Sequence, residues 1–154
     1  AEDGIRDKLV TGVQTCALPI WVWETMLGQD TYRAWTKPFN DSSRYEGSWG
    51  EGSRILFVGD TGQGSVAGMV SRIQTNRLHE LVTIEHLGMV MGGVEDTTSD
   101  AVRQWAPCYE TYRFATVDGA THLTVDVDAA PDWVPMFEES WPKALARLKE
   151  LAEQ

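Results

Sequence analysis

Six short segments with alternating apolar and polar residues make up about half of residues 44–128, and turn-forming stretches separate most of them. Alternation with a period of two is typical of strands that bury one face, and short connections join antiparallel neighbours. The segments predicted as strands are residues 44–48, 54–58, 66–73, 81–89, 109–117 and 121–128. The pattern therefore predicts an antiparallel meander.

Helical patterns flank this meander. The apolar residues within 22–27 share one helical face, and Asp30 is placed to cap a second short helix that Pro38 ends. A third short helix is expected over residues 99–105, within an acidic connection. Near the C-terminus, positions 133, 137, 141, 145, 148 and 152 are apolar at a spacing close to 3.6, which predicts a long helix. Pro142 either kinks this helix or marks the start of its main segment.

Charge and cysteine content narrow the class of protein. The formal net charge of −10 disfavours binding to nucleic acid or to anionic membrane surfaces, which require clustered Lys and Arg. No apolar run reaches the length of a membrane span. Cys16 and Cys108 are the two cysteines. We expect a cytoplasmic protein without an internal disulfide.

The first twenty residues resemble translated DNA-sequencing adapter. Back-translated into codons, residues 10–20 match the indexed adapter primer of short-read sequencing, and residues 1–7 match the flow-cell end of the same primer. We therefore expect residues 1–21 to be a non-native, adapter-derived segment, to be set aside in functional reasoning as tags are. The expected domain is a single one over residues 22–154.

Several motifs together resemble the SRPBCC (START-like, Bet v 1-like) superfamily, in the branch of bacterial homologues of the heat-shock-protein ATPase activator. These motifs are VWETML, YRAWTKPF, EGSWGEGSRILF, GMVSRI, IEHLG, GVEDTTSDAVRQWA, YETYRF and WPKALARLKELAE. The resemblance implies an α+β helix-grip fold: a curved antiparallel sheet wrapped around a long C-terminal helix, with two short helices after the first strand. The native first strand is missing here. Residues 10–15 alternate as a strand does, and we expect them to pair with the exposed sheet edge.

Within that superfamily, the space between the sheet and the C-terminal helix often holds a small molecule. The resemblance thus implies a protein that binds a small hydrophobic or amphipathic molecule, without a cofactor. One alternative is an enzyme that uses the same cavity. Another is a protein-binding module with a partner of chaperone type and an exposed apolar patch instead of a deep cavity. Fold by itself does not choose among these.

Strand alternation brings a polar group to the predicted concave face. His86 shares a face with the apolar residues of its strand, and Glu110, Tyr112 and Phe114 share a face of theirs. An inward His86 and Glu110 would orient a ligand, or serve as acid and base in the enzyme alternative. The competing interpretation is a buried structural pair, because structural pairs also perturb titration.

Aromatic residues complete the candidate site. Trp105, Trp133 and Trp141 are placed where they would line a cavity mouth and stack on a flat ligand. The three histidines are far apart in sequence and lack the spacing of metal ligands, so no metal site is predicted.

The adapter interpretation makes a prediction about stability. Residues 1–7 are mostly polar and have no apolar period to bury. Deleting them is expected to leave the melting temperature unchanged in a thermal-denaturation experiment followed by circular dichroism. A drop of more than a few degrees would show that these residues pack against the domain.

Overall fold

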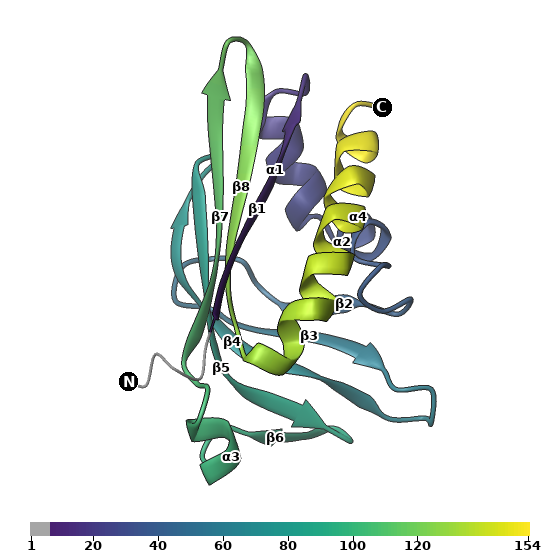
Figure 1. The fold of residues 1–154 in the computed structure, drawn as a ribbon, viewed down its shortest axis with the longest axis vertical. Helices are drawn as coiled ribbons and strands as arrows, with labels where there is room; N and C mark the ends of the chain where they lie inside the picture. Colours follow the sequence, from purple (N-terminus) through teal and green to yellow (C-terminus); the bar gives the residue numbers. More distant parts are fainter. Residues whose placement is uncertain (1–6) are drawn as a thin grey trace.

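The computed structural model describes residues 7–154, which form a strongly curved sheet with helices on one side (Figure 1). The strands are β1 (Asp7–Thr15), β2 (Arg44–Gly47), β3 (Arg54–Asp60), β4 (Val66–Arg77), β5 (Leu81–Met91), β6 (Val94–Asp96), β7 (Cys108–Val117) and β8 (Ala120–Ala129). The helices are α1 (Pro19–Leu27), α2 (Gln29–Trp35), α3 (Asp100–Arg103), a 3-10 turn η2 (Pro131–Trp133) and α4 (Val134–Ala152).

All strand pairs in the sheet are antiparallel. The order across the sheet is β1-β8-β7-β5-β4-β3-β2, and β6 pairs with the end of β5. Strands β2 to β5 follow one another directly, and β7 and β8 form a hairpin at Asp118 and Gly119, which both have positive φ. That geometry is typical of a two-residue turn that matches the twist of the flanking strands. The predicted meander is confirmed.

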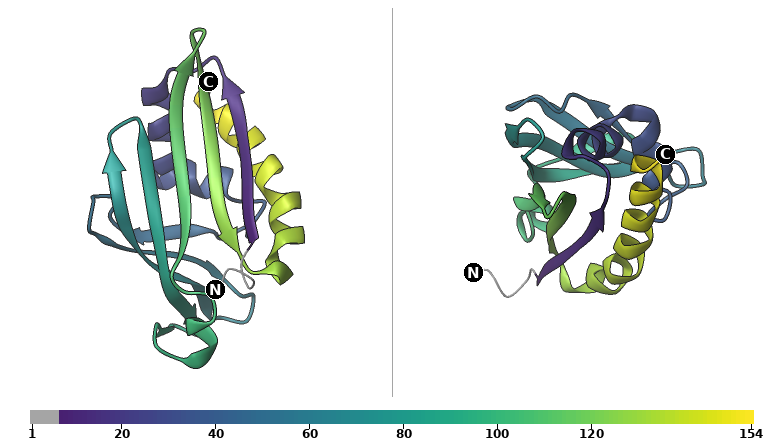
Figure 2. Two further views of the ribbon diagram at one scale, coloured as in Figure 1. Left: turned by 60° about the vertical axis from the view of Figure 1, so that its left-hand side comes forward. Right: turned by 90° about the horizontal axis from the view of Figure 1, so that it is seen from above.

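The core lies between the concave face of the sheet and α4. Figure 2 shows α4 inside the curve of the sheet, on the same side as α1 and α2. One face of α4 is almost fully buried, at Trp141, Ala144, Leu145 and Leu148. These residues belong to one buried cluster with inward residues of β3, β4, β5, β7 and β8, and α4 also lies against β1. The long C-terminal helix predicted from the apolar period is therefore confirmed, and α4 runs unbroken through Pro142.

Three local expectations need correction. Asp30 is not a cap: the residue at the cap position of α2 is Gly28, and no side chain bonds there. The connection between β5 and β7 holds β6 as well as a helix, because three of its residues pair with Met89–Met91. The helix in that connection is shorter than predicted, and Ser99 caps it by accepting a hydrogen bond from the amide of Val102.

The N-terminal segment takes the place of the first strand. β1 pairs with β8 over nine residues, from Asp7 opposite Ala129 to Thr15 opposite Thr121, which confirms the expected pairing of residues 10–15. The Thr15 hydroxyl donates to Glu153 at 2.5 Å, so the strand is also tied to the end of α4. The adapter match of residues 1–6 lies outside the described residues. The adapter origin of the rest stays a prediction.

The packing of α4 yields a stability prediction. Leu148 is fully buried in the main core. Leu148→Ala is expected to lower the free energy of unfolding by roughly 2–5 kcal/mol, because it removes buried methyl groups and leaves a void. Urea denaturation measures this. Leu78, which is 66% exposed, is the matched control, and Leu78→Ala should change stability little. Equal losses in both variants would contradict the described packing.

Candidate functional site

Four polar side chains form a continuous hydrogen-bonded chain on the concave face of the sheet. Ser71 Oγ on β4 lies 2.7 Å from His86 Nδ1 on β5. His86 Nε2 lies 3.0 Å from Glu110 Oε1 on β7. The Tyr112 hydroxyl donates to the other carboxylate oxygen of Glu110 at 2.5 Å. This polar chain, Ser71–His86–Glu110–Tyr112, links three neighbouring strands.

Strand register explains why these residues meet. His86 and Glu110 are diagonal neighbours on adjacent strands, within the reach of long side chains. Ser71 lies directly opposite His86, in a short stretch of β4 and β5 that has a register irregularity at each end. The hydrogen bond expected between His86 and Glu110 is present.

The polar chain is internally satisfied. With His86 in the tautomer that carries hydrogen on Nε2, the Ser71 hydroxyl donates to Nδ1, and Nε2–H donates to Glu110. Ser71 is fully buried, whereas the side chains of His86 and Glu110 are 8% and 16% exposed. Glu110 is therefore the member of the pair that lies nearer to solvent.

Aromatic rings surround this chain. The ring of Phe57 contacts His86 edge-on at 6.0 Å between centroids. Tyr32 of α2 packs on Phe57, Tyr45 and Trp49 at 5.2–6.4 Å. Edge-on and tilted contacts at these distances are favourable for aromatic pairs. The polar chain thus has an apolar and aromatic environment.

Two tyrosines beside Glu110 are held in their neutral form. Burial raises the pKa of Tyr32 and of Tyr112 above the ordinary 10.0, and the negative charge of Glu110 acts in the same direction on both. A phenolate at either position would be both desolvated and repelled. Both hydroxyls therefore remain hydrogen-bond donors throughout the neutral pH range.

In the described part of the protein, two indole groups on the same side of the sheet as the polar chain have a buried N–H without a hydrogen-bond partner. Trp35 Nε1 donates to the Met26 carbonyl oxygen at 3.0 Å. Within residues 7–154, Nε1 of Trp49 and Nε1 of Trp141 are buried and make no hydrogen bond. Trp141 is 3% exposed and contacts Tyr112. An unpaired buried donor costs about 1–3 kcal/mol.

The predicted site residues divide into three groups. His86, Glu110 and Tyr112 come together as described. Trp141 and Trp133 belong to a row of rings that runs from the core to the surface through Phe39 and Phe137.

The remaining two residues lie apart from the polar chain. Phe114 is buried against Trp23 of α1. Trp105 follows α3 in the connection to β7 and is half-buried.

Sequence reasoning missed Ser71, Tyr32 and Trp49. Ser71 shares a face with buried Ile73, but its place in the polar chain comes from lying opposite His86, and alternation within one strand does not show which residues of two strands lie opposite each other. Tyr32 was assigned only to a helix, and its contact with β2 and β3 residues depends on tertiary packing.

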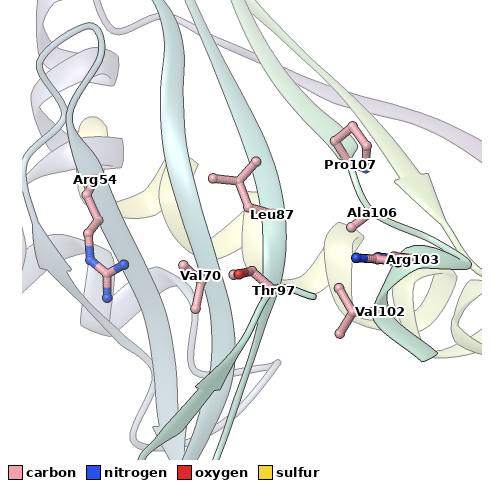
Figure 3. A pocket seen from close by; sticks show the side chains of 8 residues that line it. All are labelled: Arg54, Val70, Leu87, Thr97, Val102, Arg103, Ala106 and Pro107. Carbon is pink, nitrogen blue, oxygen red and sulfur yellow. The ribbon is translucent and has the colours of Figure 1, made fainter. Parts of the chain in front are cut away.

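Two surface hollows of residues 7–154 lie away from the space between the sheet and α4. One is a groove of about 520 Å³ on the convex face, lined by residues of β3, β4, β5 and the α3 connection (Figure 3). The other, of about 420 Å³, is bounded by α2 and the start of β2. The concave face is instead filled by the side chains of the main core.

Other types of site are not seen in the described part of the chain. No group of three or more His, Cys, Asp or Glu side chains in residues 7–154 is arranged to hold a metal ion. None of the helices there has the length and apolar character needed to cross a membrane.

Comparison with known proteins identifies the fold. No family profile matches the chain, and no curated protein matches it in sequence. Solved structures match over nearly its whole length. The protein Mll3558 from Rhizobium loti has a TM-score of 0.72 at 15% identity, covering 96% of this chain and 97% of its own. The Aha1 dimer from Colwellia psychrerythraea gives 0.68 at 15% identity, with 96% of both chains covered.

This chain has the helix-grip fold. DynU16, from the dynemicin biosynthetic locus, also matches, with a TM-score of 0.66 at 18% identity over 96% of this chain and 48% of its own. At such identities the likeness establishes the fold and leaves function to the site itself.

The buried tyrosines predict a loss of stability in alkaline solution. Their pKa is raised in the folded state, so the stabilisation is complete below pH 10 and is lost as the pH rises above it, where the unfolded chain ionises first. The free energy of unfolding is expected to fall between pH 9 and pH 11, on the order of 1 kcal/mol or more. In the double variant Tyr32→Phe/Tyr112→Phe, the free energy of unfolding should fall less over the same pH range. If it falls by the same amount as in the unmodified protein, groups other than these two tyrosines cause the loss.

Proposed function

We propose that this protein binds a small amphipathic molecule at the concave face of its sheet, with Glu110 at the polar end of the site. The observation that carries the proposal is the polar chain enclosed in aromatic rings. A polar network that only stabilises the fold needs no ring of aromatic side chains around it. Apolar walls with a few convergent polar groups are typical of small-molecule sites.

Donors and acceptors around Glu110 specify the ligand class. The carboxylate accepts hydrogen bonds and favours a ligand hydroxyl or N–H group, while the unpaired indole N–H of Trp141 favours an acceptor oxygen on the same molecule. The apolar body of the ligand would lie against rings such as Phe57. The polar chain and the aromatic rings thus favour a ligand that has both hydroxyl and carbonyl groups on an apolar frame.

Entry to this site requires side-chain movement. Phe39 and Phe137 are only partly buried and separate exposed Trp133 from buried Trp141. Rotation of these rings is the smallest change that opens a path from solvent to Tyr112 and Glu110. Changes of rotamer at a binding surface are common even where the backbone is rigid.

A matched pair of variants tests the proposal. The full chain, purified from cells, is examined by native mass spectrometry and is expected to carry a small noncovalent adduct. Tyr112→Phe removes the hydroxyl that contacts Glu110 and should reduce the adduct. Tyr109→Phe removes a hydroxyl from the same strand that contacts Glu85 instead, and should leave the adduct unchanged.

Some outcomes would count against ligand binding at the concave face. An adduct that is equally abundant in both variants would place the ligand elsewhere. Complete absence of an adduct, together with failure of an apolar fluorescent probe to bind, would leave the polar chain as a structural device. In that case the effect expected of Glu110→Gln is a loss of stability of about 1–3 kcal/mol.

The filled core favours a second candidate, a protein-binding module. A chain that lacks a deep cavity and exposes apolar side chains can use them for a protein partner. Trp133 before α4 is 52% exposed, and Met136 in the first turn of α4 is 39% exposed. Native mass spectrometry also tests this alternative, because a co-purified protein would appear as a larger complex.

The enzyme alternative has less support from the geometry. An acid–base histidine needs one ring nitrogen that can reach the substrate. Both nitrogens of His86 are already hydrogen-bonded to protein, to Ser71 and to Glu110. Turnover would require one of these bonds to break, whereas ligand binding at Glu110 does not.

A further inference from the structure

The groove on the convex face has a wall that is held firmly in place. After β6 the chain crosses β5 at Gly88, where a side-chain Cβ would lie 2.1 Å from the carbonyl oxygen of Asp96. The Asp96 carboxylate then accepts hydrogen bonds from the amides of Thr98 and Ser99, and Ser99 caps α3. The groove is therefore bounded by the sheet on one side and by a hydrogen-bonded turn and helix on the other.

An apolar floor continues beyond the groove. Val58, Val70 and Val90 form a second buried cluster that is separate from the main core. Their register places them on the opposite face of the sheet from Ile55 and the polar chain. Val70 belongs both to this cluster and to the groove. Outward faces of sheets are more often polar, so an apolar stripe here is an unusual feature.

Charged groups lie at two edges of this floor. Figure 3 shows Arg54 and Arg103 on either side of Val70, Leu87 and Val102. Arg54 is already paired with Glu95 of β6. Arg103 is exposed, and within residues 7–154 it takes part in no ion pair closer than 4.0 Å. One guanidinium therefore remains available to an incoming anion.

We propose that this groove is a second binding site, for a small free molecule with an apolar chain and a carboxylate end. Its volume of about 520 Å³ lies within the range typical of small-molecule sites. The carboxylate would pair with Arg103, and the apolar chain would lie over Leu87 and Val70. Since the whole chain carries a net charge of −10, an anion is attracted here only by local charge.

This site is independent of the concave face. Val70 and the polar chain lie on opposite sides of the sheet, so a ligand in the groove makes no contact with Glu110 or Tyr112. The two proposals can therefore succeed or fail separately.

Titration of the isotopically labelled full chain with octanoate, followed by amide NMR, tests the proposal. The largest shifts are expected at Leu87, Val102 and Arg103. The matched neutral compound, 1-octanol, should bind up to about 5-fold more weakly, because an exposed ion pair contributes up to about 1 kcal/mol. Arg103→Gln should weaken octanoate binding by a similar factor and leave octanol binding unchanged. Arg147→Gln, on the exposed side of α4, is the control.

Further variants and a vesicle assay complete the design. Leu87→Trp should block the groove to both compounds, whereas Tyr112→Phe should affect neither. The protein should not float with vesicles of anionic phospholipid, since the site takes a free molecule. Flotation that Arg103→Gln abolishes would make the groove a membrane contact and overturn the free-ligand proposal.

Several results would refute this site. They are shifts confined to His86 and Glu110, equal binding of octanoate and octanol with no effect of Arg103→Gln, or no saturable binding up to the solubility of either compound. Shifts confined to His86 and Glu110 would instead support binding at the concave face. The other two results leave the adduct expected there untouched.

Discussion

The burial of α4 against the concave face of the sheet is the contact on which the rest of the structure depends. Inward residues such as Ile73, Val82 and Ile84 are fully buried in the cluster that the sheet forms with α4, α1 and α2. Burying each such side chain is worth roughly 1.5–3 kcal/mol, so this cluster is a major source of stability. The same packing keeps water away from the polar chain, and hydrogen bonds are stronger in such a low-dielectric environment.

A polar chain within that apolar setting imposes a strict geometry. Ser71, His86 and Glu110 satisfy one another only in the observed register, and a slip of one residue would turn them to the opposite face. The network therefore selects one strand alignment, and in the proposed function it also offers a carboxylate to a ligand. Under that proposal, stability and recognition depend on the same atoms, which is why the hydroxyl deletion in Tyr112→Phe is more informative than removal of the whole side chain.

The sequence predicted the larger elements well because their signals are local. Alternation and turn residues locate the strands, and the 3.6 period locates α4. It failed where pairing decides the outcome: β6 is three residues long and exists only through its contact with β5. The site shows the same division. His86 and Glu110 were found from alternation, but the role of Ser71 depends on its pairing opposite His86. Trp133 falls in the turn before α4 and so outside its buried stripe.

The position of β1 has a consequence for the order in which the molecule assembles. Of the strands in residues 7–154, β1 comes first in the chain, yet its partner there is β8, more than a hundred residues later. Closing so long a loop is entropically unfavourable until the intervening hairpins have shortened it. The hairpins from β2 to β5 can form as they emerge, whereas β1 must wait for the final hairpin and for α4, whose end also holds Thr15. The strand that is made first is thus among the last to be secured.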